Sequence, residues 1–174
     1  YRENPPAEIT VIEPAGDIIE VTEVDRSGNP NSIIFEIKAT DNPIVTPAGI
    51  KKIAWAVAPE GDRAQAEWTF TPEQVVEFPA PQLEQTNQCK ITLPGYDTIT
   101  GSPRPQTANF TVTVTVTDAL DVDTVKTWTV KVTDVDRVPG APDAVVFDKD
   151  IVRVNEELKA IANGGTDEDG DVIT

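Results

Sequence analysis

The clearest pattern in the sequence is a strict alternation of apolar and polar residues over positions 109–117. The apolar positions are Phe110, Val112, Val114 and Val116, and threonines fill the positions between and after them. Successive side chains of a β-strand point to opposite faces of a sheet, so this alternation predicts a strand with one face in a core and one in water. After an acidic turn at residues 118–124, the alternation resumes over residues 125–133. Its apolar positions there include Trp128, Val130 and Val132. We predict that the two segments form the closing hairpin of a β-sandwich.

Shorter runs of the same kind recur along the chain, separated by clusters of Pro, Gly, Asn and Asp. The predicted strands cover residues 8–12, 18–23, 33–40, 51–58, 67–71, 89–93, 109–117 and 125–133. This spacing, with little helical periodicity, is typical of an all-β, two-layer Greek-key sandwich. Trp55 falls in an early central strand, where a sandwich of the immunoglobulin type often buries a tryptophan between its sheets.

The region between residues 71 and 106 is rich in proline, so we expect strand pairing to be interrupted there. It is interpreted as an insertion wrapped on the sandwich. Residues 72–77 fit a single helical turn, because proline is accepted at the first position of a helix.

A domain boundary is predicted where two prolines and a glycine follow the last strand. The first domain then covers residues 1–136, a linker covers 137–143, and residues 144–174 are a partial second β module or a docking tail. Residues 158–163 weakly echo residues 35–42, which indicates an internal repeat.

Charge and composition narrow the functional classes. The formal net charge is −16, so the chain is repelled by nucleic acid and by anionic lipid. Histidine is absent, which removes the usual general base and the usual zinc ligand, and we predict that the protein is not an enzyme. The single cysteine, Cys89, cannot form an intrachain disulfide and is expected to be a small buried side chain.

The sequence shows no apolar run long enough to enter a bilayer and no signal-peptide pattern. We therefore expect that the chain does not insert into a membrane directly. Because the sequence also contains no methionine, we expect it to be a mature or excised segment.

Several acidic motifs carry a family resemblance. They are Thr-Asp-Ala-Leu-Asp-Val-Asp-Thr at 117–124, Val-Lys-Val-Thr-Asp-Val-Asp at 130–136, Pro139, and Asp-Glu-Asp-Gly-Asp at 167–171. Together they resemble the junction between immunoglobulin-like or cadherin-like repeats, of the polycystic-kidney-disease type, in prokaryotic surface proteins. The resemblance implies an immunoglobulin/cadherin-like sandwich followed by the start of a second one, an extracellular or cell-surface location, and neighbouring repeats or protomers of the same protein as partners.

The resemblance also implies a metal site. In calcium-binding members, carboxylates of the linker and of the next domain's Asp-x-Asp loop converge on ions at the junction. Carried over to this chain, they are Asp134, Asp136, Asp167 and Asp169, with Asp171 as an addition. Calcium takes roughly six to eight oxygen ligands, which suits clustered carboxylates. The alternative is a solvated acidic turn.

Three non-catalytic functions follow. The first is a structural or adhesion module, stiffened by calcium if the acidic site forms. The second is a filament or pilus-like subunit, assembled by adding a strand of one protomer to the sheet edge of another. The third is a carbohydrate-binding accessory domain of a secreted enzyme, which needs exposed aromatic rings from Trp55, Trp68 and Trp128. A glycosylation pattern begins at Asn109, for which the plainer interpretation is an ordinary strand-entry residue.

Overall fold

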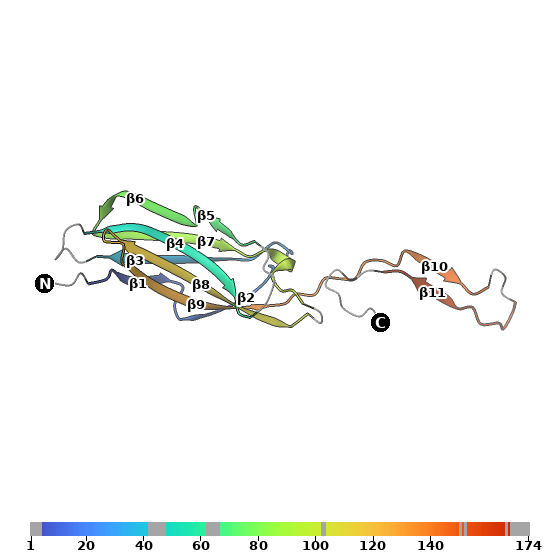
Figure 1. Cartoon of the computed structure of the whole chain (residues 1–174). Helices are drawn as coiled ribbons and strands as arrows, with labels where there is room; N and C mark the ends of the chain where they lie inside the picture. The colour runs from blue at the N-terminus through green and yellow to red at the C-terminus, as the bar shows by residue number, and fades with distance from the viewer. Residues whose placement is uncertain are drawn as a thin grey trace. The chain divides into compact units, whose positions relative to one another are not determined.

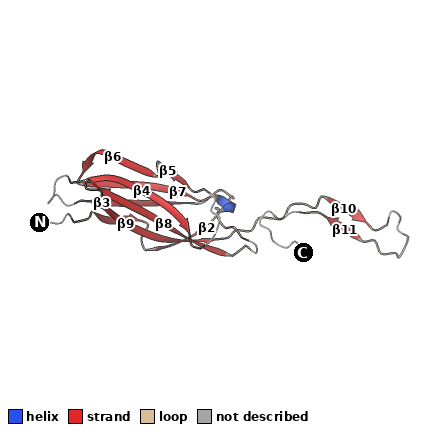
Figure 2. Cartoon of the chain, in the orientation of Figure 1, coloured by secondary structure: helices blue, strands red, loops and turns tan. Residues whose placement is uncertain are grey.

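The computed structural model describes residues 5–41, 48–61, 67–101, 104–149, 151, 153–165 and 167. The chain divides into two compact units. The first comprises Tyr1–Thr100 and Pro105–Val135, and the second comprises Gly101–Arg104 and Asp136–Thr174. Strands make up most of the regular structure in both units (Figures 1 and 2). Among the described residues, no helix is long and apolar enough to cross a membrane.

The first unit consists of two sheets packed face to face. The four-stranded sheet has the order β1 (Glu8–Glu13), β3 (Ser32–Thr40), β7 (Glu84–Thr92) and β5 (Thr69–Thr71). The five-stranded sheet has the order β2 (Ile18–Thr22), β9 (Asp123–Thr133), β8 (Thr107–Asp118), β4 (Ile50–Pro59) and β6 (Val75–Gln82). A short 3-10 helix, η1 (Gly95–Asp97), precedes β8. This arrangement confirms the predicted all-β, immunoglobulin-like sandwich.

The chain changes sheets at both sides of the sandwich. β1 pairs antiparallel with β3, whereas β2, which follows it directly, pairs parallel with β9 in the other sheet. In the same way β5 pairs with β7, and β6 pairs with β4 in the opposite sheet. Each crossing leaves two edge strands joined by a few residues, so β1, β2, β5 and β6 are the four edges of the sandwich.

The inward faces of the two sheets form one apolar core. The predicted core positions of β8 and β9 are buried, namely Phe110, Val112, Val114, Val116, Trp128, Val130 and Val132. Trp55 is 1% exposed, and its ring lies 5.7 Å from that of Phe35 and 6.1 Å from that of Trp128, measured between centroids. The interpretation of Trp55 as a residue between the sheets is therefore confirmed.

The proline-rich region differs from the prediction. The helical turn expected at residues 72–77 is wrong, because Val75 begins β6, and β7 begins at Glu84 rather than at residue 89. Pro79 and Pro81 lie within β6. Proline is tolerated there because an edge strand needs hydrogen-bond donors on one side only.

The second unit contains an antiparallel pair of strands, β10 (Ala144–Phe147) and β11 (Ala160–Asn163). All eight strand residues are exposed, including Val145, Val146, Phe147 and Ile161. The predicted β structure after the linker is therefore present, but the described residues of this pair bury none of its apolar side chains.

Candidate functional site

The structure places the five predicted calcium ligands in different settings. Asp134 follows β9 in the first unit, where it is half-buried and its backbone N–H donates to the carbonyl of Gln106. Asp136 belongs to the second unit and is exposed, and Asp167 belongs to the same unit and is half-buried. Asp169 and Asp171 lie outside the described residues. Within the described part of the chain, no three His, Cys, Asp or Glu side chains gather closely enough to hold a metal ion, and calcium stays a prediction.

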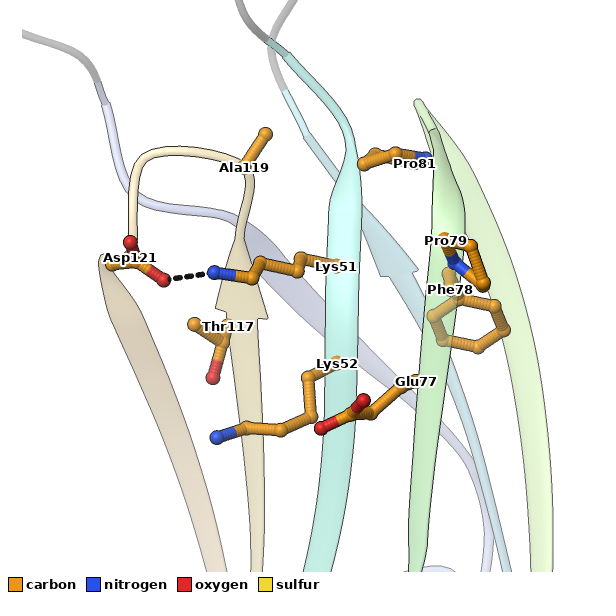
Figure 3. A pocket seen from close by; sticks show the side chains of 9 residues that line it. All are labelled: Lys51, Lys52, Glu77, Phe78, Pro79, Pro81, Thr117, Ala119 and Asp121. Atoms are coloured by element: carbon orange, nitrogen blue, oxygen red, sulfur yellow. Dashed lines mark hydrogen bonds and ion pairs between the residues drawn. The ribbon is translucent and has the colours of Figure 1, made fainter.

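A pocket opens instead at one end of the outer face of the five-stranded sheet. It has a volume of about 540 Å³, and Figure 3 shows its lining. The lining residues are Lys51, Lys52, Glu77, Phe78, Pro79, Pro81, Thr117, Ala119 and Asp121.

Two irregularities of strand pairing create this pocket. Between Ile50 and Lys52 the register of β4 shifts against β8, which is a β-bulge at Lys51. Ile50 pairs with Gln82 of β6, but Lys52 pairs with Glu77, so the four residues Phe78–Pro81 have no partner on β4 and bulge away from it. Gly49 fits this bend because it has a φ of +117°, and a Cβ at that position would lie 2.9 Å from Pro81.

The charged groups of the pocket are balanced. Lys51 Nζ donates to Asp121 Oδ1, and this hydrogen bond raises the pKa of the Lys51 amine and lowers the pKa of the Asp121 carboxyl. The nearby Glu77 carboxylate also contributes to raising the Lys51 pKa. With Lys52 beside them, the pocket carries two positive and two negative side chains at neutral pH. Such a lining can hydrogen-bond a small polar molecule, but it favours neither anions nor cations.

These residues were missed in the sequence, although a signal was present. Ile50 and Ile53 are both fully buried but stand three positions apart, which is an odd step in a period-two strand. An odd step of this kind marks a bulge, and it places both intervening lysines outside the core.

All three tryptophans are buried, at 1 to 5% exposure. Trp55 Nε1 donates to Asn87 Oδ1 at 2.8 Å, Trp68 packs on Phe110, and Trp128 stacks on Trp55. None of them presents a ring face to solvent. The alternative of a carbohydrate platform built from these three rings is therefore wrong for the sandwich, because all three are buried in its core.

Two carboxylates in the sandwich serve its turns. Asp118 is fully buried, and its Oδ1 accepts from the N–H of Leu120 at 2.8 Å and of Val122 at 2.9 Å. Asp41 Oδ2 accepts from the N–H of Gly49 at 2.6 Å. These hydrogen bonds stabilise the turns after β3 and β8, and we therefore assign the two carboxylates a structural role.

Cys89 and Asn109 have ordinary surroundings. Cys89 is buried in β7, and burial raises the pKa of its thiol to about 11, so it is not a nucleophile at neutral pH. Asn109 is exposed on β8 and donates through Nδ2 to Glu60 Oε2 at 3.1 Å.

Sequence comparison finds no match: no protein-family model fits the chain, and neither does any curated protein. Solved structures of similar fold include the periplasmic chaperone SfaE, at 14% identity and a TM-score of 0.48, over 73% of this chain and 58% of that one. Another is the CooA pilin subunit from enterotoxigenic Escherichia coli, at 9% identity and a TM-score of 0.49, over 75% of this chain and 99% of that one. PapD-like domain 7 of human CEP192 shares 10% identity, with a TM-score of 0.40, over 78% and 89% of the two chains. The chain thus spans little more than half of the chaperone. At such low identities and TM-scores, these likenesses carry no argument about activity, partner or location.

Proposed function

We propose that this chain is a non-catalytic structural module of an extracellular or cell-surface protein. In this proposal the sandwich is a rigid spacer, and β10 with β11 is the first pair of neighbouring strands of a second sandwich of the same kind. The observation that carries it is a correspondence between β10–β11 and β1–β3, in both sequence and pairing.

The sequence correspondence lies along the second strand of each pair. Residues 36–42 read Glu-Ile-Lys-Ala-Thr-Asp-Asn, and residues 157–163 read Glu-Leu-Lys-Ala-Ile-Ala-Asn. Glu, Lys, Ala and Asn recur at the same places, and Ile37 is replaced by the similar Leu158. β3 ends within the first segment and pairs antiparallel with β1, although β2 lies between them in the chain, and β11 ends the second segment and pairs antiparallel with β10.

The register of pairing extends the correspondence to the first strand. Ala39 lies opposite Ile9, and its counterpart Ala160 lies opposite Phe147. Phe147 therefore takes the place of Ile9, which packs against the core of the first unit. In β10, by contrast, Phe147 is 55% exposed and Val145 is 54% exposed.

An isolated two-stranded sheet is at best marginally stable in water, because it has no second layer against which to bury its apolar face. The exposed face of β10 and β11 is therefore the face that a second sheet covers in a complete sandwich. Repetition of a self-contained β-sandwich along one chain suits a spacer role better than a catalytic one.

A chimeric chain tests this correspondence. Residues 1–163 are joined to residues 43–135, so that β10 and β11 are followed by a copy of β4 to β9. If the strand pairs β10–β11 and β1–β3 are equivalent, the added residues fold as a second sandwich, and the calorimetric enthalpy of unfolding rises by roughly 80 kcal/mol near 60 °C.

The control is Phe147→Asp, made both in the chimera and in the 174-residue chain. It should lower the melting temperature of the added sandwich in the chimera and leave the first sandwich unchanged in both chains. A chimera whose added residues are digested quickly by protease, with no gain in enthalpy, would contradict the proposal.

A further inference from the structure

The four edges of the sandwich are protected unequally. Edge strands expose unpaired backbone groups, and natural sheets shield them with bulges, prolines, charges or short lengths. β1 has a register shift between Val11 and Glu13, β5 has three residues and is followed by Pro72, and β6 contains Pro79 and Pro81. β2 contains no proline, no lysine and no register shift along its five residues.

The hydrogen bonds of β2 show which of its groups are unused. Thr129 N donates to Asp17 O at 2.8 Å, and Glu23 N donates to Thr133 O at 3.1 Å, at the two ends of its parallel pairing with β9. Alternate residues of a strand bond to the same neighbour, so the odd-numbered residues face β9. Ile18, Glu20 and Thr22 therefore direct their N–H and C=O groups to the outer side, where no described strand pairs with them.

One end of this outer side is already closed. Asn31 Nδ2 donates to the carbonyl of Thr22 at 2.8 Å. The open stretch is therefore Ile18 to Val21, in which Ile18 is 68% exposed. We call this stretch the β2 edge.

We propose that the β2 edge binds strand β10 of a second copy of this chain. β10 is four residues long and uncharged, and it contains no proline. Asp148 N donates to Lys159 O at 3.0 Å, which by the same alternation turns Val146 toward β11. The N–H and C=O groups of Val145 and Phe147 then point to the outer side, where no strand of the described residues pairs with them. Val145 and Phe147 are two positions apart, as are Ile18 and Glu20, so the outward backbone groups of the two strands match in spacing.

The pairing would stabilise both strands. It gives β10–β11 a third strand, and it covers the unprotected edge of the sandwich with main-chain hydrogen bonds, as in β-strand addition. Because β10 of one copy binds β2 of the next, the contact is head-to-tail and builds open chains, or rings where the rotation between copies closes. The formal charge of −16 on each copy opposes this association, so added salt should strengthen it.

This inference is independent of the proposed module repeat. β10 corresponds to β1, which is an edge strand of its sheet, so the outer side of β10 stays free even in a complete second sandwich. If the chimera does not fold, the proposed binding at the β2 edge is not affected. If the chain does not associate, the correspondence between β10–β11 and β1–β3 is not affected.

Sedimentation velocity of the 174-residue chain over a concentration series, at low and at high salt, is the first measurement. We expect head-to-tail species that grow with concentration and are favoured by salt. Glu20→Pro removes the central outward N–H and should reduce the association constant at least tenfold. Glu20→Thr loses the same ion pair with Lys131 but keeps the N–H, and it should associate like the parent chain.

Hydrogen exchange gives a second readout. The amides of Ile18 and Glu20 should gain protection as concentration rises, together with those of Val145 and Phe147, whereas Ile19, which faces β9, should not change. If circular dichroism shows that Glu20→Pro is unfolded, Val145→Pro with Val145→Thr as its control replaces that pair on the partner strand. A chain that stays monomeric at millimolar concentration in high salt, protection independent of concentration, or equal association of each proline and threonine variant would overturn the proposal.

Discussion

The sandwich and the β10–β11 hairpin are built from similar strand residues, yet they bury them very differently. Val112, Val114 and Val116 in β8 are fully buried, whereas Val145, Val146 and Phe147 in β10 are about half exposed. Both segments form hydrogen-bonded strands, but only the first faces a second sheet. A local pattern is thus enough to form a strand, while its stability depends on what covers its apolar face.

The largest contrast is expected from truncating an aromatic residue in each region. Trp55→Ala should lower the free energy of unfolding of the sandwich by about 3–5 kcal/mol, because it removes a buried indole that packs on Phe35 and Trp128. Phe147→Ala should change it by less than about 0.5 kcal/mol, because that ring is exposed in the free chain. Denaturant titration followed by circular dichroism measures both values. Equal losses would show that the hairpin unfolds together with the sandwich.

A smaller contrast is expected between two aspartates that each accept a backbone N–H beside a strand. Asp118→Ala should cost the sandwich about 1–3 kcal/mol, since it removes a fully buried carboxylate that accepts hydrogen bonds from the N–H groups of Leu120 and Val122. Asp148 accepts from Lys159 N at 3.0 Å in an exposed setting. Asp148→Ala should therefore leave the unfolding midpoint of the sandwich within about 0.5 kcal/mol of the parent value. A loss of similar size in both variants would refute the contrast.

The smallest effect concerns reactivity rather than stability. Burial raises the pKa of the Cys89 thiol to about 11, so its thiolate is scarce at pH 8 and grows about tenfold per pH unit below that pKa. A cysteine placed on the exposed hairpin by Ala162→Cys should react with a disulfide reagent at least roughly 200-fold faster at pH 8, from the difference in thiolate fraction alone. The reaction is followed by absorbance, with Cys89 in denaturant as the reference. Rapid labelling of native Cys89 would contradict its placement in the core.

Much of the sandwich could be predicted because its inner strands follow the period of a sheet. The alternation around Phe110 and Val130 correctly identified which side chains meet in the core. The same reasoning failed for β6, because its prolines and polar residues do not give the alternation of a strand. The segment can be a strand only because it lies at the edge of its sheet. The pocket beside Lys51 was missed for a related reason, since a bulge depends on how two strands are aligned. The calcium ligands stay predictions, with two of the five outside the described residues.

By itself, the sequence determined the all-β class, the inward positions of β8 and β9, and the burial of Trp55. These properties follow from the alternation of side chains along one strand, which is local. Tertiary structure alone decided that β2 runs parallel to β9, that Asp118 is buried, and that one of four edges lacks protection. These properties depend on which strands become neighbours, and pairing between segments far apart in the chain leaves no periodic trace in either segment.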